Sequence, residues 1–270
     1  MAPRLWSCFR NKHVDGYGHD RSLRMEEEPV AVGDGPVVVE MFTSQGCATS
    51  PPADLMLSRL GRGDFQLRLP VVLLAFHVDY WDYVGWKDPY GSSQWTVRQK
   101  AYVQALGLDT LFTPQFVVQG RAHLTGNDEN ALISAIMSAR RFPAPSFQVA
   151  TATFSRPTSA FLEVTLNGAL RTRVDSVEAD VMVALYETGL VTDCPRGENK
   201  GRVLSNDYVV RILEKLCTVK DHPAKKPVSA SVSFPLWESF NSCRCGMAVF
   251  VQSSSHQILG SQNFLLPDDI

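Results

Sequence analysis

The sequence lacks the features of several large classes of protein. Its longest apolar run, Pro70–Phe76, has the length of a strand, whereas a membrane helix needs roughly 18–20 residues. Lys and Arg total 26 and Asp and Glu total 28, so the net charge is −2. This balance gives no electrostatic reason to bind nucleic acid or an anionic membrane surface. We therefore expect neither partner.

The N-terminal region has no recognisable targeting signal. It has no apolar core like that of a secretory signal, and acidic residues such as Asp15 and Asp20 are mixed with its basic ones. Position 2 is not glycine, so the N-myristoylation pattern is missing. We expect residues 1–34 to form a flexible tail and the protein to be cytoplasmic.

Motifs for nucleotide or metal binding are also missing. There is no phosphate loop, no Rossmann glycine fingerprint and no G-x-S-x-G nucleophile elbow. Zinc sites usually have two paired ligand clusters, but here Cys243 and Cys245 form a single C-x-C pair. We expect no metal and no resident cofactor. The C-x-C pair could form a small redox disulfide, or resolve a disulfide at Cys47 if the domains pack that way. The remaining alternative is two unconnected thiols.

The first half of the chain alternates strand and helix patterns. Residues from about 35 to 142 contain short apolar runs typical of buried strands and longer periodic segments typical of helices. The predicted strands are 36–42, 71–76 and 116–118, and the predicted helices are 51–60, 93–106 and 127–141. This order predicts an α/β domain with a mixed sheet.

The second half has a different pattern. After a linker at 142–145, alternating segments predict a β-rich, sandwich-like domain over residues 146–267. Predicted strands are 147–154, 160–166, 181–186, 228–234 and 247–251, with a helix at Asp207–Cys217. The charged loop Gly197–Arg202 is interpreted as a structural charge network that braces this domain, with Glu198 and Arg202 paired to each other or to Asp207 and Arg211.

Cys47 is the candidate nucleophile. It follows a buried strand and precedes the helix that Pro51 and Pro52 open. The free N–H groups and positive dipole of a helix start favour the thiolate, which is the reactive form. The motif is C-x-x-S, so Ser50 occupies the place of a second cysteine. Serine can support a thiolate by a hydrogen bond but cannot resolve a disulfide, so the site is monothiol.

Two further segments could belong to the Cys47 site. Thr113 and Pro114 immediately precede a strand. In thioredoxin folds a cis proline here lies against the active cysteine and exposes backbone for substrate, so we expect a cis bond beside Cys47. The loop that begins at His77 contains Asp79 and Trp81, which could line the pocket and adjust the thiol pKa. The alternative is an aromatic cluster with a purely structural role.

Several long motifs resemble a known family. They are Val38–Cys47, Pro51–Asp54, His77–Tyr83, Gly85–Pro89, Thr113–Gln115, Gly197–Arg202 and Asp207–Arg211. Over residues 36–266 the chain resembles the thioredoxin-like family catalogued as domain of unknown function 1223. That family's usual motif is Cys-Ser-Ser-Cys, and this chain departs from it at Ser50. The resemblance implies a thioredoxin-like N-terminal domain over residues 35–142 but assigns no reaction.

The leading functional hypothesis is monothiol thiol-disulfide exchange on a protein or small-thiol substrate, as an oxidoreductase or isomerase. Cys47 is the expected nucleophile, Ser50 supports it, and Pro114 positions the substrate. Thr113, His77, Asp79 and Trp81 are the expected pocket residues, and glutathione could serve as reductant. The alternative is a non-catalytic binding or scaffold module that has lost redox activity. The sequence leaves the oligomeric state open.

Overall fold

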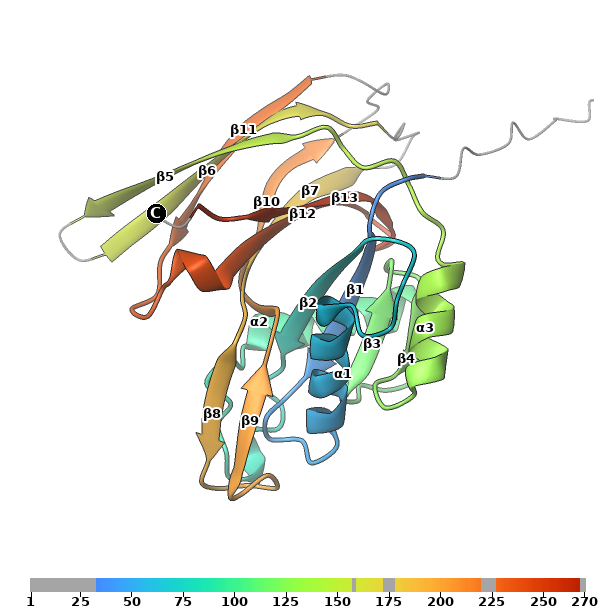
Figure 1. Cartoon of the computed structure of the whole chain (residues 1–270), viewed down its shortest axis with the longest axis vertical. Coiled ribbons are helices and arrows are strands. Elements are labelled where there is room, and N and C mark those ends of the chain that lie inside the picture. The colour runs from blue at the N-terminus through green and yellow to red at the C-terminus, as the bar shows by residue number, and fades with distance from the viewer. Residues whose placement is uncertain (1–32, 157–158, 172–177, 220–226, 268–270) are drawn as a thin grey trace, which may run out of the picture. The chain divides into compact units, whose positions relative to one another are not determined.

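Two parallel strands form the centre of the structure, a computed structural model that describes residues 33–156, 159–171, 178–219 and 227–267 (Figure 1). β1 (Val37–Thr43) is buried along its whole length, and β2 (Val71–His77) is buried from its second residue on. They pair in parallel, as expected for apolar strands covered on both faces. The two predicted buried strands are confirmed.

Helix α1 (Ser50–Arg62) connects these two strands. It begins at the prolines, which lose nothing in a first turn where N–H groups lack intrahelical partners. It ends at Gly63, whose φ of 80° is the left-handed conformation that glycine adopts easily. Leu57 and Leu60 point into an apolar core shared with β1 and β2. The Cys47 turn therefore lies between a fixed strand end and a fixed helix start.

β1 and β2 belong to a mixed sheet of eight strands. Its order is β13-β12-β7-β10-β2-β1-β3-β4. The other members are β3 (Gln115–Val118), β4 (Ala122–Thr125), β7 (Ala179–Glu187), β10 (Val209–Val219), β12 (Cys245–Ser253) and β13 (Ile258–Leu265). Strands from both halves of the chain thus share one sheet.

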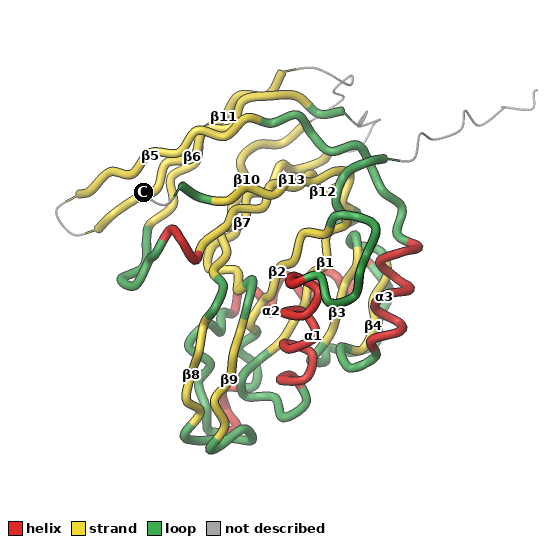
Figure 2. Tube along the Cα trace, in the orientation of Figure 1, coloured by secondary structure: helices red, strands yellow, loops and turns green. Residues whose placement is uncertain are grey.

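Three α-helices occur among the described residues, and they lie along the β1–β4 part of this sheet (Figure 2). α1 and α3 (Glu129–Ser138) pack in one apolar cluster, whereas α2 (Ser93–Ala105) packs in another with Phe42 and Phe76. Asp128 caps α3 by accepting a hydrogen bond from the N–H of Ala131 at 2.9 Å.

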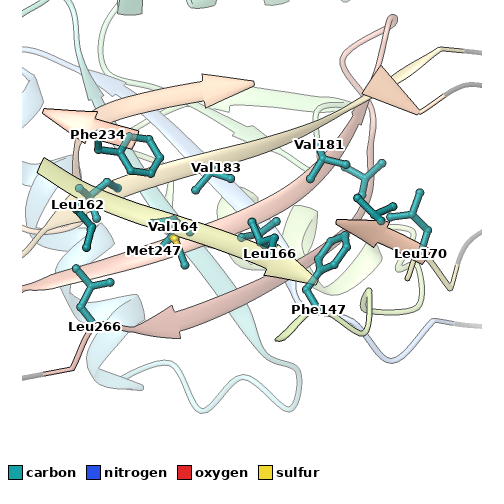
Figure 3. Packing of buried hydrophobic residues seen from close by; sticks show 14 of the residues in the cluster. Phe147, Leu162, Val164, Leu166, Leu170, Val181, Val183, Phe234, Met247 and Leu266 are labelled. Atoms are coloured by element: carbon teal, nitrogen blue, oxygen red, sulfur yellow. The ribbon is translucent and has the colours of Figure 1, made fainter. Parts of the chain in front are cut away.

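A second sheet, of three strands, packs against the part of the large sheet that contains β7 and β12. It has the order β11-β6-β5, formed by β5 (Gln148–Arg156), β6 (Ser159–Ala169) and β11 (Pro227–Pro235). In Figure 3, Leu162, Val164 and Leu166 of β6 face Val181 and Val183 of β7. The third sheet is a hairpin, β8 (Leu190–Cys194) and β9 (Arg202–Asn206), whose second strand contacts α1.

The predicted fold class is wrong. The protein is mainly β, with one large mixed sheet and only three α-helices among the described residues, and not a thioredoxin-like α/β domain followed by a sandwich-like domain. The sheet joins the two halves through a parallel bridge between Val209 of β10 and Ala75 of β2. No local pattern encodes so distant a pairing. The domain limits of 35–142 and 146–267 stay a prediction, and most of the 1–34 tail lies outside the described residues.

The predicted helix at Asp207–Cys217 is also wrong, because residues 209–217 of this segment belong to strand β10. The strand has two irregularities in its pairing with β7, between Val210 and Ile212 and between Lys215 and Cys217. A bulge inserts an extra residue and breaks the alternation of side chains along a strand. The broken alternation imitates a helical period, which explains the error.

Candidate functional site

Cys47 lies in the tight turn between β1 and α1. Its N–H donates to the carbonyl oxygen of Ser44 at 3.1 Å, and its own carbonyl accepts from the N–H of Ser50 at 3.3 Å. Ser50 begins α1 and is fully buried. Only 2% of Cys47 is exposed. The turn therefore holds the cysteine at the helix start with little access to solvent.

The thiol meets two threonines. Its Sγ lies 3.2 Å from Oγ1 of Thr49 and 3.6 Å from the carbonyl oxygen of Thr113. Thr49 occupies the N-cap of α1, but its side chain makes no capping hydrogen bond. Its hydroxyl instead lies between the sulfur and the carbonyl oxygen of Thr113, to which it donates at 3.5 Å. A polar shell thus surrounds a thiol that is otherwise withdrawn from water.

These hydrogen bonds set the protonation of the thiol. Burial, the largest influence, raises the pKa of Cys47, but hydrogen bonds with the side chains of Thr113, Thr49 and Ser50 together outweigh it and hold the pKa below its usual value. The indole N–H of Trp81 donates to Oγ1 of Thr113 at 2.7 Å. This bond fixes the Thr113 side chain beside the thiol. The net result of the arrangement is a pKa below the usual thiol value.

The Thr113–Pro114 peptide bond is cis, which confirms the predicted isomer. Pro114 accepts a hydrogen bond from the N–H of Gly126 at 2.8 Å. Trp81 packs closely against the cysteine turn, because a Cβ added at Gly46 would lie only 2.9 Å from the Cβ of Trp81. Cys47, Ser50, Thr113, Pro114 and Trp81, all predicted for the site, are therefore brought together around one turn.

His77 lies in a buried cluster that Asp88 connects to this turn through the N–H of Gln45. Its Nδ1 is 2.7 Å from Oδ2 of Asp88, and neither side chain is exposed. Burial alone would lower the pKa of His77, but the Asp88 carboxylate raises it above its ordinary value. The pKa of Asp88, which burial would raise, is held below its ordinary value mainly by His77. We conclude that the two groups form an ion pair.

Asp54 belongs to the same cluster. Its Oδ1 accepts from the hydroxyl of Thr43 at 2.9 Å, and Thr43 is the register partner of His77. Burial, only partly offset by His77, raises the pKa of Asp54 to about 7. Asp54 also lines a groove of about 340 Å³ between α1 and β9. It is therefore a buried carboxyl group that can exchange protons near neutral pH.

Asp79 does not take part in the site that was predicted for it. Its Oδ1 accepts a hydrogen bond from the hydroxyl of Thr96, in the first turn of α2, at 2.6 Å. The C-x-C pair does not lie on one strand face either, because Cys243 is in a short 3₁₀ turn and Cys245 begins β12. Burial, followed by the charge of Glu187, raises the pKa of Cys245 to about 12, which makes it a poor attacking thiol.

Sequence reasoning missed four residues that shape the site: Thr49, Asp54, Asp88 and Asn199. Thr49 and Asp54 could have been found from the sequence, because both closely follow Cys47 along the chain. Asp88 comes from the aromatic loop and accepts the backbone N–H of Gln45 at 2.7 Å. Asn199 comes from the distant hairpin, and only the charged loop Gly197–Arg202 signalled it.

Two negative findings apply to the part of the chain that the structure describes. No three His, Cys, Asp or Glu side chains are grouped so that they could hold a metal ion. No helix in the described ranges is long and apolar enough to cross a membrane.

The site is thus a single hydrogen-bonded cysteine at a helix start, just after the end of an interior strand of the mixed sheet. The chain belongs to the family described as "Protein of unknown function (DUF1223)", whose model matches residues 38–252. A search of curated proteins finds no match.

Solved structures give two similar folds. A crystal structure of an Agrobacterium tumefaciens protein, determined by a structural genomics consortium, is 27% identical with a TM-score of 0.60, covering 88% of this chain and 97% of that one. HBP35 of Porphyromonas gingivalis is 14% identical with a TM-score of 0.57, covering 87% of this chain and 76% of that one. The second likeness concerns the fold alone.

Proposed function

We propose that this protein performs monothiol thiol-disulfide exchange through Cys47. The observation that carries the proposal is the place of the Cys47 sulfur at the start of α1, 3.2 Å from Oγ1 of Thr49 and 3.6 Å from the carbonyl oxygen of Thr113. In this polar setting the pKa of the thiol lies below its usual value although burial alone would raise it. A structural cysteine has no need of such stabilisation of its charged form.

The exchange proceeds in two steps. The Cys47 thiolate attacks one sulfur of a substrate disulfide, a new S–S bond forms, and the other sulfur leaves as a thiolate that takes a proton from solvent. Because position 50 is serine, no neighbouring thiol can displace the substrate. A second thiol, such as glutathione in the cytosol, then loses its proton to solvent and attacks the substrate sulfur of the mixed disulfide. A new S–S bond forms between this thiol and the substrate, and Cys47 leaves as a thiolate.

The second candidate is a binding module without redox activity. The 2% exposure of Cys47 favours it, because a disulfide substrate must reach the sulfur. The two candidates differ in what Cys47 does in the folded protein. Thiol exchange requires Cys47-dependent adducts, whereas a binding module predicts an inert thiol.

The test compares wild type, Ser50→Cys and Cys47→Ser. We expect wild type to accumulate mixed disulfides on non-reducing gels, because release is slow. Ser50→Cys should reduce this trapping and raise the rate of insulin reduction, since it restores a resolving thiol. Cys47→Ser should abolish both signals. An absence of Cys47-dependent adducts, together with no gain of activity in Ser50→Cys, refutes the proposal and supports the binding module.

A further inference from the structure

The loop Gly197–Arg202 at the tip of the β8–β9 hairpin contacts the cysteine turn directly. The side chain of Asn199 is 1% exposed. Its Nδ2 donates to the carbonyl oxygen of Gln45 at 2.9 Å and to that of Cys47 at 3.0 Å. One amide thus holds both carbonyls on the two sides of Gly46. The predicted charge network is not what organises this loop.

The orientation of this amide is fixed by Arg202. The guanidinium donates from Nη1 to Oδ1 of Asn199 at 2.9 Å. Because arginine can only donate, it must face the oxygen of the amide, and the NH₂ group must face the cysteine turn. The hairpin therefore presents the NH₂ group of Asn199, already oriented, to the carbonyl oxygens of Gln45 and Cys47.

The hairpin tip is itself positioned by the aromatic loop. A Cβ at Gly197 would lie 2.9 Å from Cβ of Trp86, so glycine permits this close approach. The indole N–H of Trp86 donates to Oε1 of Gln45 at 3.1 Å. Gln45 also donates from Nε2 to Asn206, the last residue of β9, at 2.8 Å. The hairpin and the cysteine turn are thus joined at both ends of β9.

We propose that Asn199, presented by the β8–β9 hairpin, is a positioning residue for Cys47 that keeps the thiol against Thr49 and Thr113. This inference rests on the proposed exchange function. The two bonds from Asn199 hold the turn that places Sγ among its hydrogen-bond partners. Loss of this amide leaves two carbonyls without their donor, so the turn should relax and weaken the contacts that lower the pKa of the thiol.

The test measures the thiolate absorbance of Cys47 against pH, as the difference between each variant and the same variant carrying Cys47→Ser. We compare wild type with Asn199→Ala, Asn199→Asp, Arg202→Ala and Lys200→Ala. Lys200 is an exposed neighbour in the same loop and serves as the matched control. Asn199→Asp keeps the shape of the side chain but cannot donate, and it adds a carboxylate near the sulfur, so Asn199→Ala reports the lost hydrogen bonds without a new charge.

We expect the titration midpoint to rise in both Asn199 variants, most in Asn199→Asp, and less in Arg202→Ala. A rise of one pH unit lowers the thiolate fraction by up to about tenfold, the full factor applying at pH values well below the midpoint. Lys200→Ala should match wild type. A merely structural role of Asn199 would lower the melting temperature but leave the midpoint unchanged, and that result overturns the inference.

The two proposals fail separately. If wild type has the lowered midpoint and forms Cys47 adducts while the Asn199 variants titrate like wild type, only the hairpin inference fails. If wild type titrates as an ordinary thiol and no variant differs from it, both fail.

Discussion

Replacing the buried Asp54 with asparagine should stabilise the protein at neutral pH. The carboxyl group titrates near pH 7 in the folded protein, because burial raises its pKa to about 7, compared with about 3.9 in an unfolded chain. Between these two values the folded state holds a proton that the unfolded state has released. The free energy of unfolding of wild type therefore falls as the pH rises from about 4 to about 7.

The size of this effect follows from the shift. A difference of about three pH units at 1.36 kcal/mol per unit corresponds to about 4 kcal/mol. Asparagine keeps an oxygen for the Thr43 hydroxyl and carries no charge. The free energy of unfolding of Asp54→Asn should therefore not show this fall between pH 4 and pH 7. The difference in stability between variant and wild type should grow by about 4 kcal/mol from pH 4 to pH 7.

Urea denaturation at a series of pH values measures this difference. Asp128→Asn is the control, because Asp128 is the N-cap of α3 and asparagine caps a helix equally well. The reasoning is refuted if the stability difference between Asp54→Asn and wild type is the same at pH 4 and pH 7. It is also refuted if the variant is less stable than wild type at pH 7.

Two further predictions concern the site and the core. Thr113→Val removes a hydroxyl that helps to lower the pKa of Cys47, so this pKa should rise. Thiolate absorbance measures the change, and an unchanged titration would show that the Thr113 side chain does not stabilise the thiolate. Arg98→Ala should lower the free energy of unfolding by about 3–5 kcal/mol, because it leaves the buried Glu40 carboxylate without its partner at 2.7 Å. Urea denaturation measures this loss, and a cost below about 1 kcal/mol, typical of an exposed pair, would contradict it.

The sequence predicted the local parts of the structure well. β1, β2 and α1 could be found because buried apolar runs, prolines and glycine act within a few residues of one another. The same reasoning placed Cys47 at the helix start and Ser50 in its first turn. It also identified Thr113 and Pro114 as neighbours of the thiol.

The sequence could not predict what depends on distant pairing. The bridge between Val209 and Ala75 joins residues far apart in the chain and makes one sheet from the two halves. Asn199 reaches Cys47 only because the β8–β9 hairpin folds back beside α1. Asp79 carries the same charge as Asp88, yet only Asp88 faces His77, and spacing alone does not distinguish them.

The most direct test of the central claim is the reaction of the folded wild-type protein with oxidised glutathione at neutral pH, followed by peptide mass spectrometry. Cys243 is exposed and serves as the internal reference within the same molecule. We predict that Cys47 forms the glutathione mixed disulfide faster than Cys243, because hydrogen bonds hold the pKa of Cys47 below the usual thiol value, and that the adduct persists until a second thiol is added. Modification of Cys243 while Cys47 stays unmodified in the folded protein would contradict the account.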